Sequence, residues 1–73
     1  MRLIKATALS KILGKSTWFI RDYFTKKYPI GIIINNGIAY YNIEFAKEIA
    51  CQISYQLKKT IEEILEEIDN YRP

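Results

Sequence analysis

Apolar positions recur with a helical period in the first part of the chain and with a strand period after it. The helical spacing predicts a first helix over residues 8–13 and a second over residues 17–27. Thr7 and Ser16 have the side-chain oxygens that cap helix starts. Gly14 between the two helices can take the left-handed backbone angles that end a helix. Two helices joined by so short a turn are typical of a helix-turn-helix.

The next stretch, IGIIINNGIAYYNI, has the pattern of a β-hairpin. Pro29 disfavours helical angles at the residue before it, so the second helix ends there. Asn36-Gly37 is the preferred sequence of a two-residue hairpin turn, because both positions need positive φ. The resulting register pairs Asn35 with Ile38, Ile34 with Ala39, Ile33 with Tyr40, and Ile32 with Tyr41. One face must pack on the helices, since isolated hairpins are marginal in water. Residues 3–4 favour a further, very short strand.

Asn42 can cap a third helix, which we expect to run to about Asp69. Its later apolar positions alternate in steps of four and three, which is the spacing of a coiled-coil seam. These positions are Leu57, Ile61, Ile64 and Ile68. We expect them to form a homodimer; the alternative is that the helix folds back on its own domain.

The outward side of the second helix carries the candidate chemistry. At about 100° per residue, Phe19, Ile20, Tyr23 and Phe24 face one way and Trp18, Arg21, Asp22 and Thr25 the other. An indole, a guanidinium, a carboxylate and a hydroxyl on one exposed face suit the reading of a DNA duplex. Two alternatives remain open: Trp18 could belong to the core, and Arg21 could form an ion pair with Asp22.

Composition and charge narrow the classes of function that fit the chain. The chain has 73 residues, enough for one small domain, and a net charge of +3 that is unevenly spread. Residues 1–59 carry ten lysines and arginines against three carboxylates, and residues 60–73 carry one arginine against five carboxylates. A basic body fits a polyanionic ligand; the alternative is a set of unrelated solvated faces.

Several classes of function are disfavoured. The chain has no histidine and one cysteine, Cys51, so no zinc ligand set and no internal disulfide are expected. Cys51 lies near the apolar side of the third helix, so we expect it to be at least half-buried. No nucleophile with a base and no phosphate-binding glycine loop is recognisable, so we expect neither an enzyme nor a cofactor. No apolar run reaches the roughly 20 residues of a membrane span. Lys5, Ser10 and Lys11 interrupt the apolar residues at the start, so we expect a cytoplasmic protein without a signal peptide or membrane partner.

The segments TALSKILGKSTWFIRDYF and IGIIINNGIAYYNIEFAKEI resemble the winged-helix excisionases (recombination directionality factors) of phages and conjugative transposons, and the related MerR-type DNA-binding domains. The resemblance covers roughly residues 3–53. It implies an α+β, mostly helical fold: a winged helix-turn-helix with a two-stranded hairpin wing and a long C-terminal helix. That helix is similar to the dimerising helix of MerR-type regulators.

The resemblance further implies sequence-specific binding of double-stranded DNA, with the second helix in the major groove and the wing tip near the backbone or the minor groove. Lys15, Lys26 and Lys27 flank the helix and Lys5 and Lys11 lie nearby, and we expect these lysines to position the protein on phosphates without reading sequence. The expected DNA contacts are Lys15, Ser16, Thr17, Trp18, Arg21, Thr25, Lys26, Lys27, Asn35 and Asn36, although the two asparagines are turn formers first.

We therefore expect a DNA-binding domain over residues 1–53 and a dimerisation or partner-binding segment over residues 54–73. The expected role is that of a small mobile-element or phage accessory protein. It would bend or coat DNA for a recombinase, or act with another DNA-bound protein at a promoter. The alternatives are a transcriptional or plasmid-maintenance regulator of the same fold, and a protein-interaction module that uses the amphipathic third helix.

Overall fold

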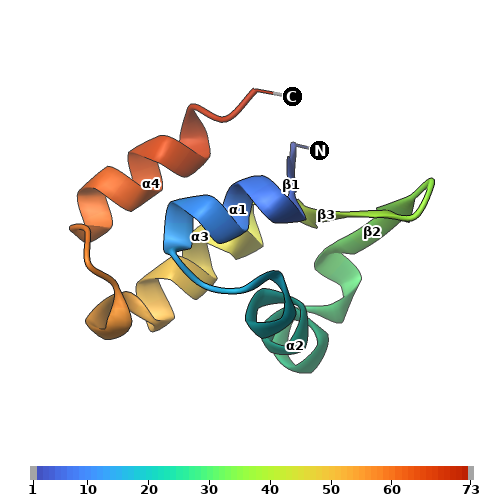
Figure 1. The fold of residues 1–73 in the computed structure, drawn as a ribbon, viewed down its shortest axis with the longest axis horizontal. Helices are drawn as coiled ribbons and strands as arrows, with labels where there is room; N and C mark the ends of the chain where they lie inside the picture. The colour runs from blue at the N-terminus through green and yellow to red at the C-terminus, as the bar shows by residue number, and fades with distance from the viewer. Residues whose placement is uncertain (1, 73) are drawn as a thin grey trace.

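The computed structural model describes residues 2–72, in which helices surround one side of a small sheet (Figure 1). The elements in chain order are β1 (Leu3–Lys5), α1 (Ala6–Leu13), α2 (Thr17–Lys27), the 3₁₀ turn η1 (Pro29–Gly31), β2 (Ile32–Asn35), β3 (Ile38–Asn42), α3 (Ile43–Gln52), the 3₁₀ turn η2 (Ser54–Gln56) and α4 (Ile61–Asp69). The described chain is thus an α+β domain with four α-helices and a three-stranded antiparallel sheet. Within residues 2–72, no helix has the length and apolar character needed to cross a membrane.

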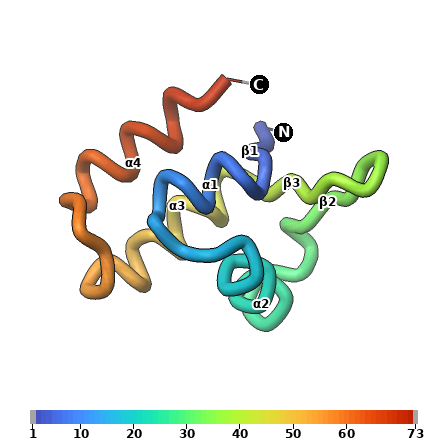
Figure 2. The backbone as a smooth tube through the Cα atoms, in the orientation of Figure 1, coloured from blue at the N-terminus to red at the C-terminus, as the bar shows by residue number. Residues whose placement is uncertain are grey.

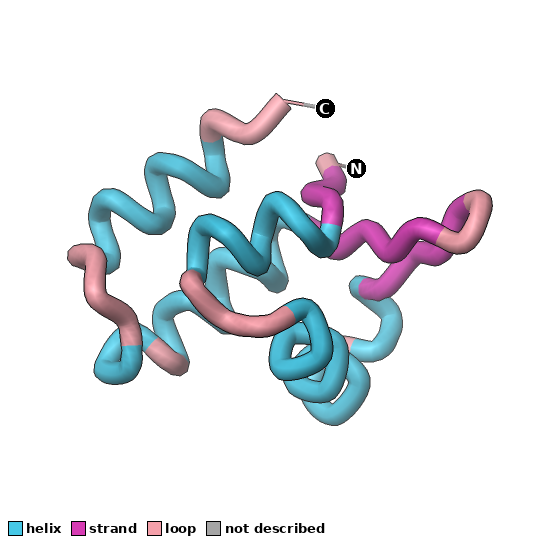
Figure 3. Tube along the Cα trace, viewed as in Figure 1, coloured by secondary structure: helices cyan, strands magenta, loops and turns pink. Residues whose placement is uncertain are grey.

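The sheet has the strand order β1-β3-β2. All four hairpin pairs predicted from the Asn36-Gly37 turn are confirmed. Asn36 and Gly37 have φ angles of 52° and 78°, as a two-residue turn of this sequence requires. The short strand at the N-terminus is also confirmed: Ile4 pairs with Tyr41, and both side chains are buried. Figure 3 shows the hairpin, in magenta, projecting away from the helices.

The core lies between the sheet and the helices, and two pairs of stacked aromatic rings lie in it or pack against it. The rings of Phe24 and Tyr41 stack with their centroids 4.2 Å apart, and those of Tyr28 and Phe45 stack at 4.7 Å. The first contact joins α2 to β3, and the second joins Tyr28, the residue after α2, to α3. The fully covered aliphatic side chains around them are Ile4, Leu9, Ile20, Ile43, Ile49, Ile53, Ile64 and Ile68.

The first two helices follow the predicted boundaries except at one end. α1 begins at Ala6, directly after β1, with Lys5 at the cap position and no side-chain cap. The expectation that Thr7 caps a helix beginning at residue 8 is wrong, because the strand delivers the chain into helical geometry two residues earlier. Gly14 ends α1 at φ 67°, and Ser16 Oγ accepts a 3.0 Å hydrogen bond from the Phe19 N–H, as predicted.

The expectation of one long third helix is wrong. α3 ends at Gln52, and after η2 the chain reverses into α4, which packs beside α1 and α3 (Figure 2). Thr60 caps α4 by accepting from the Glu63 N–H at 3.3 Å. Ile64 and Ile68 are buried in the chain's own core, and Leu57 and Ile61 pack against it. The C-terminal helix therefore folds back on its own domain, as the alternative expectation had it.

Asp69 fastens the end of α4 to the rest of the domain. Its Oδ1 lies 2.9 Å from Lys47 Nζ of α3 and 3.8 Å from the Arg2 guanidinium beside β1. The Arg2 side chain also donates to the Asp69 carbonyl oxygen. The hydrogen bond to Asp69 raises the pKa of Lys47 above its ordinary value of 10.5. The two ends of the described chain consequently lie side by side (Figure 1).

Candidate nucleic-acid interface

The core and α3 fix the orientation of α2. Ile20 and Phe24 are buried on its inner side. On its flank, the Gln52 side-chain amide of α3 accepts from the Tyr23 hydroxyl at 2.9 Å and donates to the Tyr28 hydroxyl at 2.8 Å. With one side packed and one flank bonded, the helix presents a defined outer face.

That outer face carries Trp18 and Arg21. The Trp18 side chain is 76% exposed, so the alternative that it belongs to the core is wrong. Asp22 forms its ion pair with Lys26, at 3.1 Å, and not with Arg21. Arg21 is exposed and makes no ion pair within residues 2–72. A bare indole and an uncompensated guanidinium therefore stand one helical turn apart.

The hairpin and α2 line one groove. Its volume is about 520 Å³, and its walls include Thr17, Trp18 and Arg21 from α2 and Gly37 and Ile38 from the hairpin. The start of α1 closes one end with Lys5, Ala6 and Thr7. In Figure 1 the hairpin projects to the right of α2. The groove thus brings together two elements that are separate in sequence.

Tyr41, which is buried, also lines this groove together with Arg21. Burial raises the pKa of the Tyr41 phenol above its ordinary value of 10.0, and the positive charge of Arg21 opposes part of that rise. Because the phenol stays neutral at physiological pH, it leaves the charge of Arg21 uncompensated.

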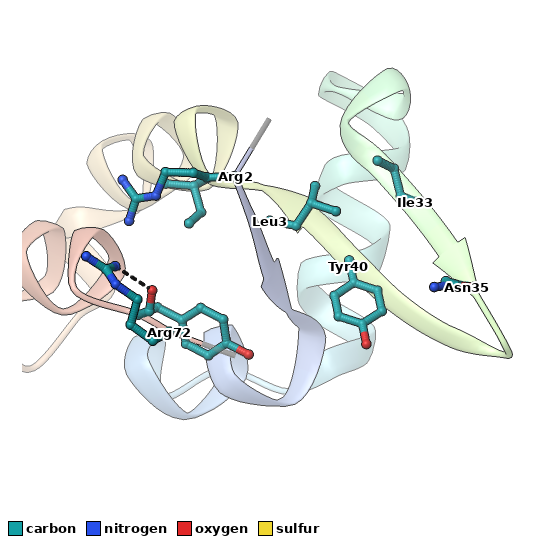
Figure 4. Close-up of a pocket in the computed structure, with 8 residues that line it drawn as sticks. Arg2, Leu3, Ile33, Asn35, Tyr40 and Arg72 are labelled. Carbon is teal, nitrogen blue, oxygen red and sulfur yellow. Dashed lines mark hydrogen bonds between the residues drawn. The ribbon is translucent and has the colours of Figure 1, made fainter.

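The hairpin tip is neutral and partly apolar. Asn36 is exposed at the turn, and Ile34 and Ile38 beside it are 52% and 38% exposed. Asn35 lines a different hollow of about 480 Å³ on the other side of the sheet, together with Tyr40 and Arg2 (Figure 4). The two asparagines predicted as one contact point therefore lie in different surroundings.

The remaining predicted contacts surround α2, and several already have partners within the chain. Ser16 Oγ accepts from Phe19, and Thr25 Oγ1 donates to the Arg21 carbonyl oxygen at 2.7 Å. Lys15 Nζ donates to Gln56 Oε1 at 3.0 Å. Lys27 Nζ lies 5.8 Å from the centroid of the Tyr23 ring. Neither of these two lysines is neutralised by its partner.

Thr7, Gly37 and Ile38 line the groove but were not among the predicted contacts, and Lys5, predicted only as a nearby lysine for phosphates, lines it too. The hairpin register was a signal for Ile38, since it places that residue directly after the turn. No local signal identifies Thr7, because only the docking of β1 and α1 on the hairpin brings it there.

No group of three or more histidine, cysteine, aspartate or glutamate side chains among residues 2–72 is placed to hold a metal ion. Cys51 is free and exposed, so the expectation that it is at least half-buried is wrong. No protein-family model, curated protein or solved structure shows significant similarity to the chain.

Proposed function

We propose that the protein binds double-stranded DNA as a winged helix-turn-helix, with α2 in the major groove and the β2–β3 hairpin as the wing. The observation that carries this proposal is the shared groove, in which Trp18 and Arg21 of α2 face Gly37 and Ile38 of the hairpin. A helix presented after a tight turn can enter the major groove, and an adjacent hairpin then meets the backbone or the minor groove.

Arg21 supplies the expected base contact. An uncompensated guanidinium can make two hydrogen bonds to guanine, worth roughly 1–3 kcal/mol of discrimination against the wrong base. Trp18 beside it offers apolar surface to a thymine methyl group or to sugars. Asn36 at the neutral wing tip offers an amide to the acceptors of the minor groove.

Lysines around α2 supply contacts to phosphates, which position the protein without reading sequence. Lys15 precedes the helix, and Lys26 and Lys27 end it. These three lysines are part of the excess of positive charge over residues 1–59.

The biological role that we propose is that of an accessory DNA-binding factor, similar to an excisionase acting with a recombinase or to a MerR-type protein at a promoter. A transcriptional or plasmid-maintenance regulator is the alternative. A dimer through Leu57, Ile61, Ile64 and Ile68 would have to open the core in which those side chains pack. Single copies, alone or side by side on repeated sites, are therefore the proposed binding unit.

The protein-interaction alternative has less support than DNA binding. It required a free apolar stripe on the C-terminal helix, and the apolar side of α4 faces the chain's own core.

Fluorescence anisotropy with a pool of short random duplexes at several salt concentrations tests the proposal. We expect the logarithm of the binding constant to fall linearly with the logarithm of salt concentration. Arg21→Ala should weaken binding to a selected site by about 1–3 kcal/mol, roughly 5- to 150-fold.

Arg72→Ala is the matched control, because Arg72 is an exposed arginine that lines the hollow on the other side of the sheet. It should bind as the wild type does. No binding at low salt, or equal losses in the two variants, would contradict the proposal.

A further inference from the structure

A second hollow, of about 280 Å³, lies where the end of α1 meets the segment between η2 and α4. Four lysines line it: Lys11, Lys15, Lys58 and Lys59. In Figure 1 this segment, in orange, lies to the left of α2, whereas the hairpin lies to its right. The two flanks of α2 thus differ in charge: the hairpin from Ile32 to Asn42 contains no lysine or arginine, and Lys5 is the one lysine of the described chain that lines the groove on its side.

The four lysines differ in what already balances their charge. Lys59 Nζ lies 3.0 and 2.9 Å from the two carboxylate oxygens of Glu67 and is paired. Lys15 Nζ bonds to the neutral amide oxygen of Gln56 and lies 5.3 Å from the centroid of the Phe19 ring, so neither contact neutralises it. Lys11 and Lys58 are exposed and form no ion pair in the described part of the chain. Three positive charges around one hollow therefore have no counter-charge from the protein.

The reversal of the chain after α3 creates this arrangement and the core holds it. Leu57 packs against the core before Lys58, and Ile64 is buried after it. The hydrogen bond from Lys15 to Gln56 ties the turn before α2 to the same segment. Lys58 is thus held near Lys11 and Lys15 by contacts on both of its sides.

We propose that Lys11, Lys15 and Lys58 bind phosphodiester groups of DNA on the flank of α2 remote from the hairpin; this rests on the proposed function. A helix in the major groove, which is about 12 Å wide, is bordered by a sugar-phosphate backbone on each side. The neutral hairpin meets one border and the lysine hollow meets the other. Most of the salt dependence on these two flanks then comes from the lysine side, because each neutralised phosphate releases counterions.

The salt slope of DNA binding separates the lysines. In the double variant Lys11→Ala/Lys58→Ala we expect the slope of log K against log salt to become shallower by about two, and in each single variant by about one. Sequence preference should not change, because phosphate contacts carry no base information.

Lys59→Ala is the matched control: the same substitution in the adjacent residue, with a side chain that Glu67 already neutralises. It should keep the wild-type slope, and circular dichroism should show that all variants are folded. An unchanged slope in the double variant, or an equal loss in Lys59→Ala, would overturn the site. If Arg21→Ala weakens DNA binding and the lysine variants do not, only this inference fails. If the wild type does not bind DNA, the proposed function fails first.

Discussion

The ion pair formed by Asp22 determines which positively charged side chains of α2 lack a counter-charge. It lies next to Arg21 in sequence, yet its carboxylate pairs with Lys26 one turn later at 3.1 Å. This pair leaves Arg21 uncompensated and reduces the positive charge at the end of the helix. A carboxylate on a surface that meets phosphates is repulsive unless it accepts a hydrogen bond from cytosine.

Replacing Asp22 by Asn should therefore tighten binding to non-specific DNA and steepen its salt slope, since it removes a negative charge and frees Lys26. Anisotropy titrations at several salt concentrations measure both effects. Glu44→Gln is the control, because Glu44 is an exposed carboxylate on α3 that pairs with Lys47. Weaker DNA binding in Asp22→Asn would show instead that the carboxylate contacts a base.

Gly31 is needed because the structure leaves no room for a side chain at this position, and not because of a positive φ angle. A Cβ atom at this position would lie 2.6 Å from Cδ2 of the Phe45 ring, which is itself stacked on Tyr28. We expect Gly31→Ala to lower the free energy of unfolding by about 1–3 kcal/mol, as overpacking does in a filled core. Urea denaturation measures the loss. Gly31→Ala/Phe45→Leu should lose less than the two single changes added together, because the shorter side chain removes the clash.

The raised pKa of Tyr41 makes the free energy of unfolding fall at alkaline pH. Its folded pKa is raised by burial, so above about pH 10 the unfolded chain releases the phenol proton before the folded chain does. The contribution of Tyr41 is complete below pH 10 and is lost as pH rises through the raised folded pKa. Lys47 acts in the same direction.

Tyr41→Phe should therefore flatten, but not abolish, the fall in urea midpoint between pH 9 and pH 11. Arg21→Ala should raise the pKa of Tyr41 further, which a phenolate absorbance titration can detect. A fall of unchanged steepness in Tyr41→Phe would contradict the assignment to this phenol.

At the scale of elements, the sequence predicted what short-range chemistry determines. The hairpin register follows from Asn36-Gly37, and the bounds of α2 follow from Ser16 and Pro29, so these features could be read from a few neighbouring residues. The outward position of Trp18 and Arg21 follows from the helical period alone. What could not be predicted is which distant side chains complete the surface.

The break after α3 was missed because its segment contains neither glycine nor proline, and the apolar spacing continues through it. A local signal was present: Thr60 and Glu63 have the spacing of a capping box, and Thr60 does cap α4. The position of Lys58 depends on α4 returning to the core, which no local pattern encodes. A periodic apolar stripe indicates that one side of a helix is buried. It does not indicate whether the chain's own domain or a second copy buries it.

The fold-back of α4 makes Ile64 a test of the core. Ile64→Ala should lower the free energy of unfolding by about 2–5 kcal/mol, since Ile64 is buried beside α1 and α3. The melting temperature should not depend on protein concentration, because the contact lies within one chain. A melting temperature that rises with concentration would indicate a dimer held together by this helix.

At the scale of the molecule, charge and shape assign opposite roles to its two sides. Cations gather around α2 and the lysine hollow, whereas the exposed side of α4 carries Glu62, Glu63, Glu66 and Glu67. The two regions meet where Glu67 pairs with Lys59 at the hollow. A polyanion would approach the first side and be repelled by the second. We therefore expect one orientation on DNA, with α4 facing away from the duplex.

Nuclear magnetic resonance of the labelled protein, titrated with a short duplex, tests this orientation most directly. We predict that the largest amide shift changes fall on Thr17–Thr25 and on the hairpin tip at Asn36–Ile38, with smaller ones at Lys11, Lys15 and Lys58. The amides of Glu62–Asp69 should stay unchanged. Changes confined to α4, or no changes at α2 under conditions where DNA binds, would contradict the account.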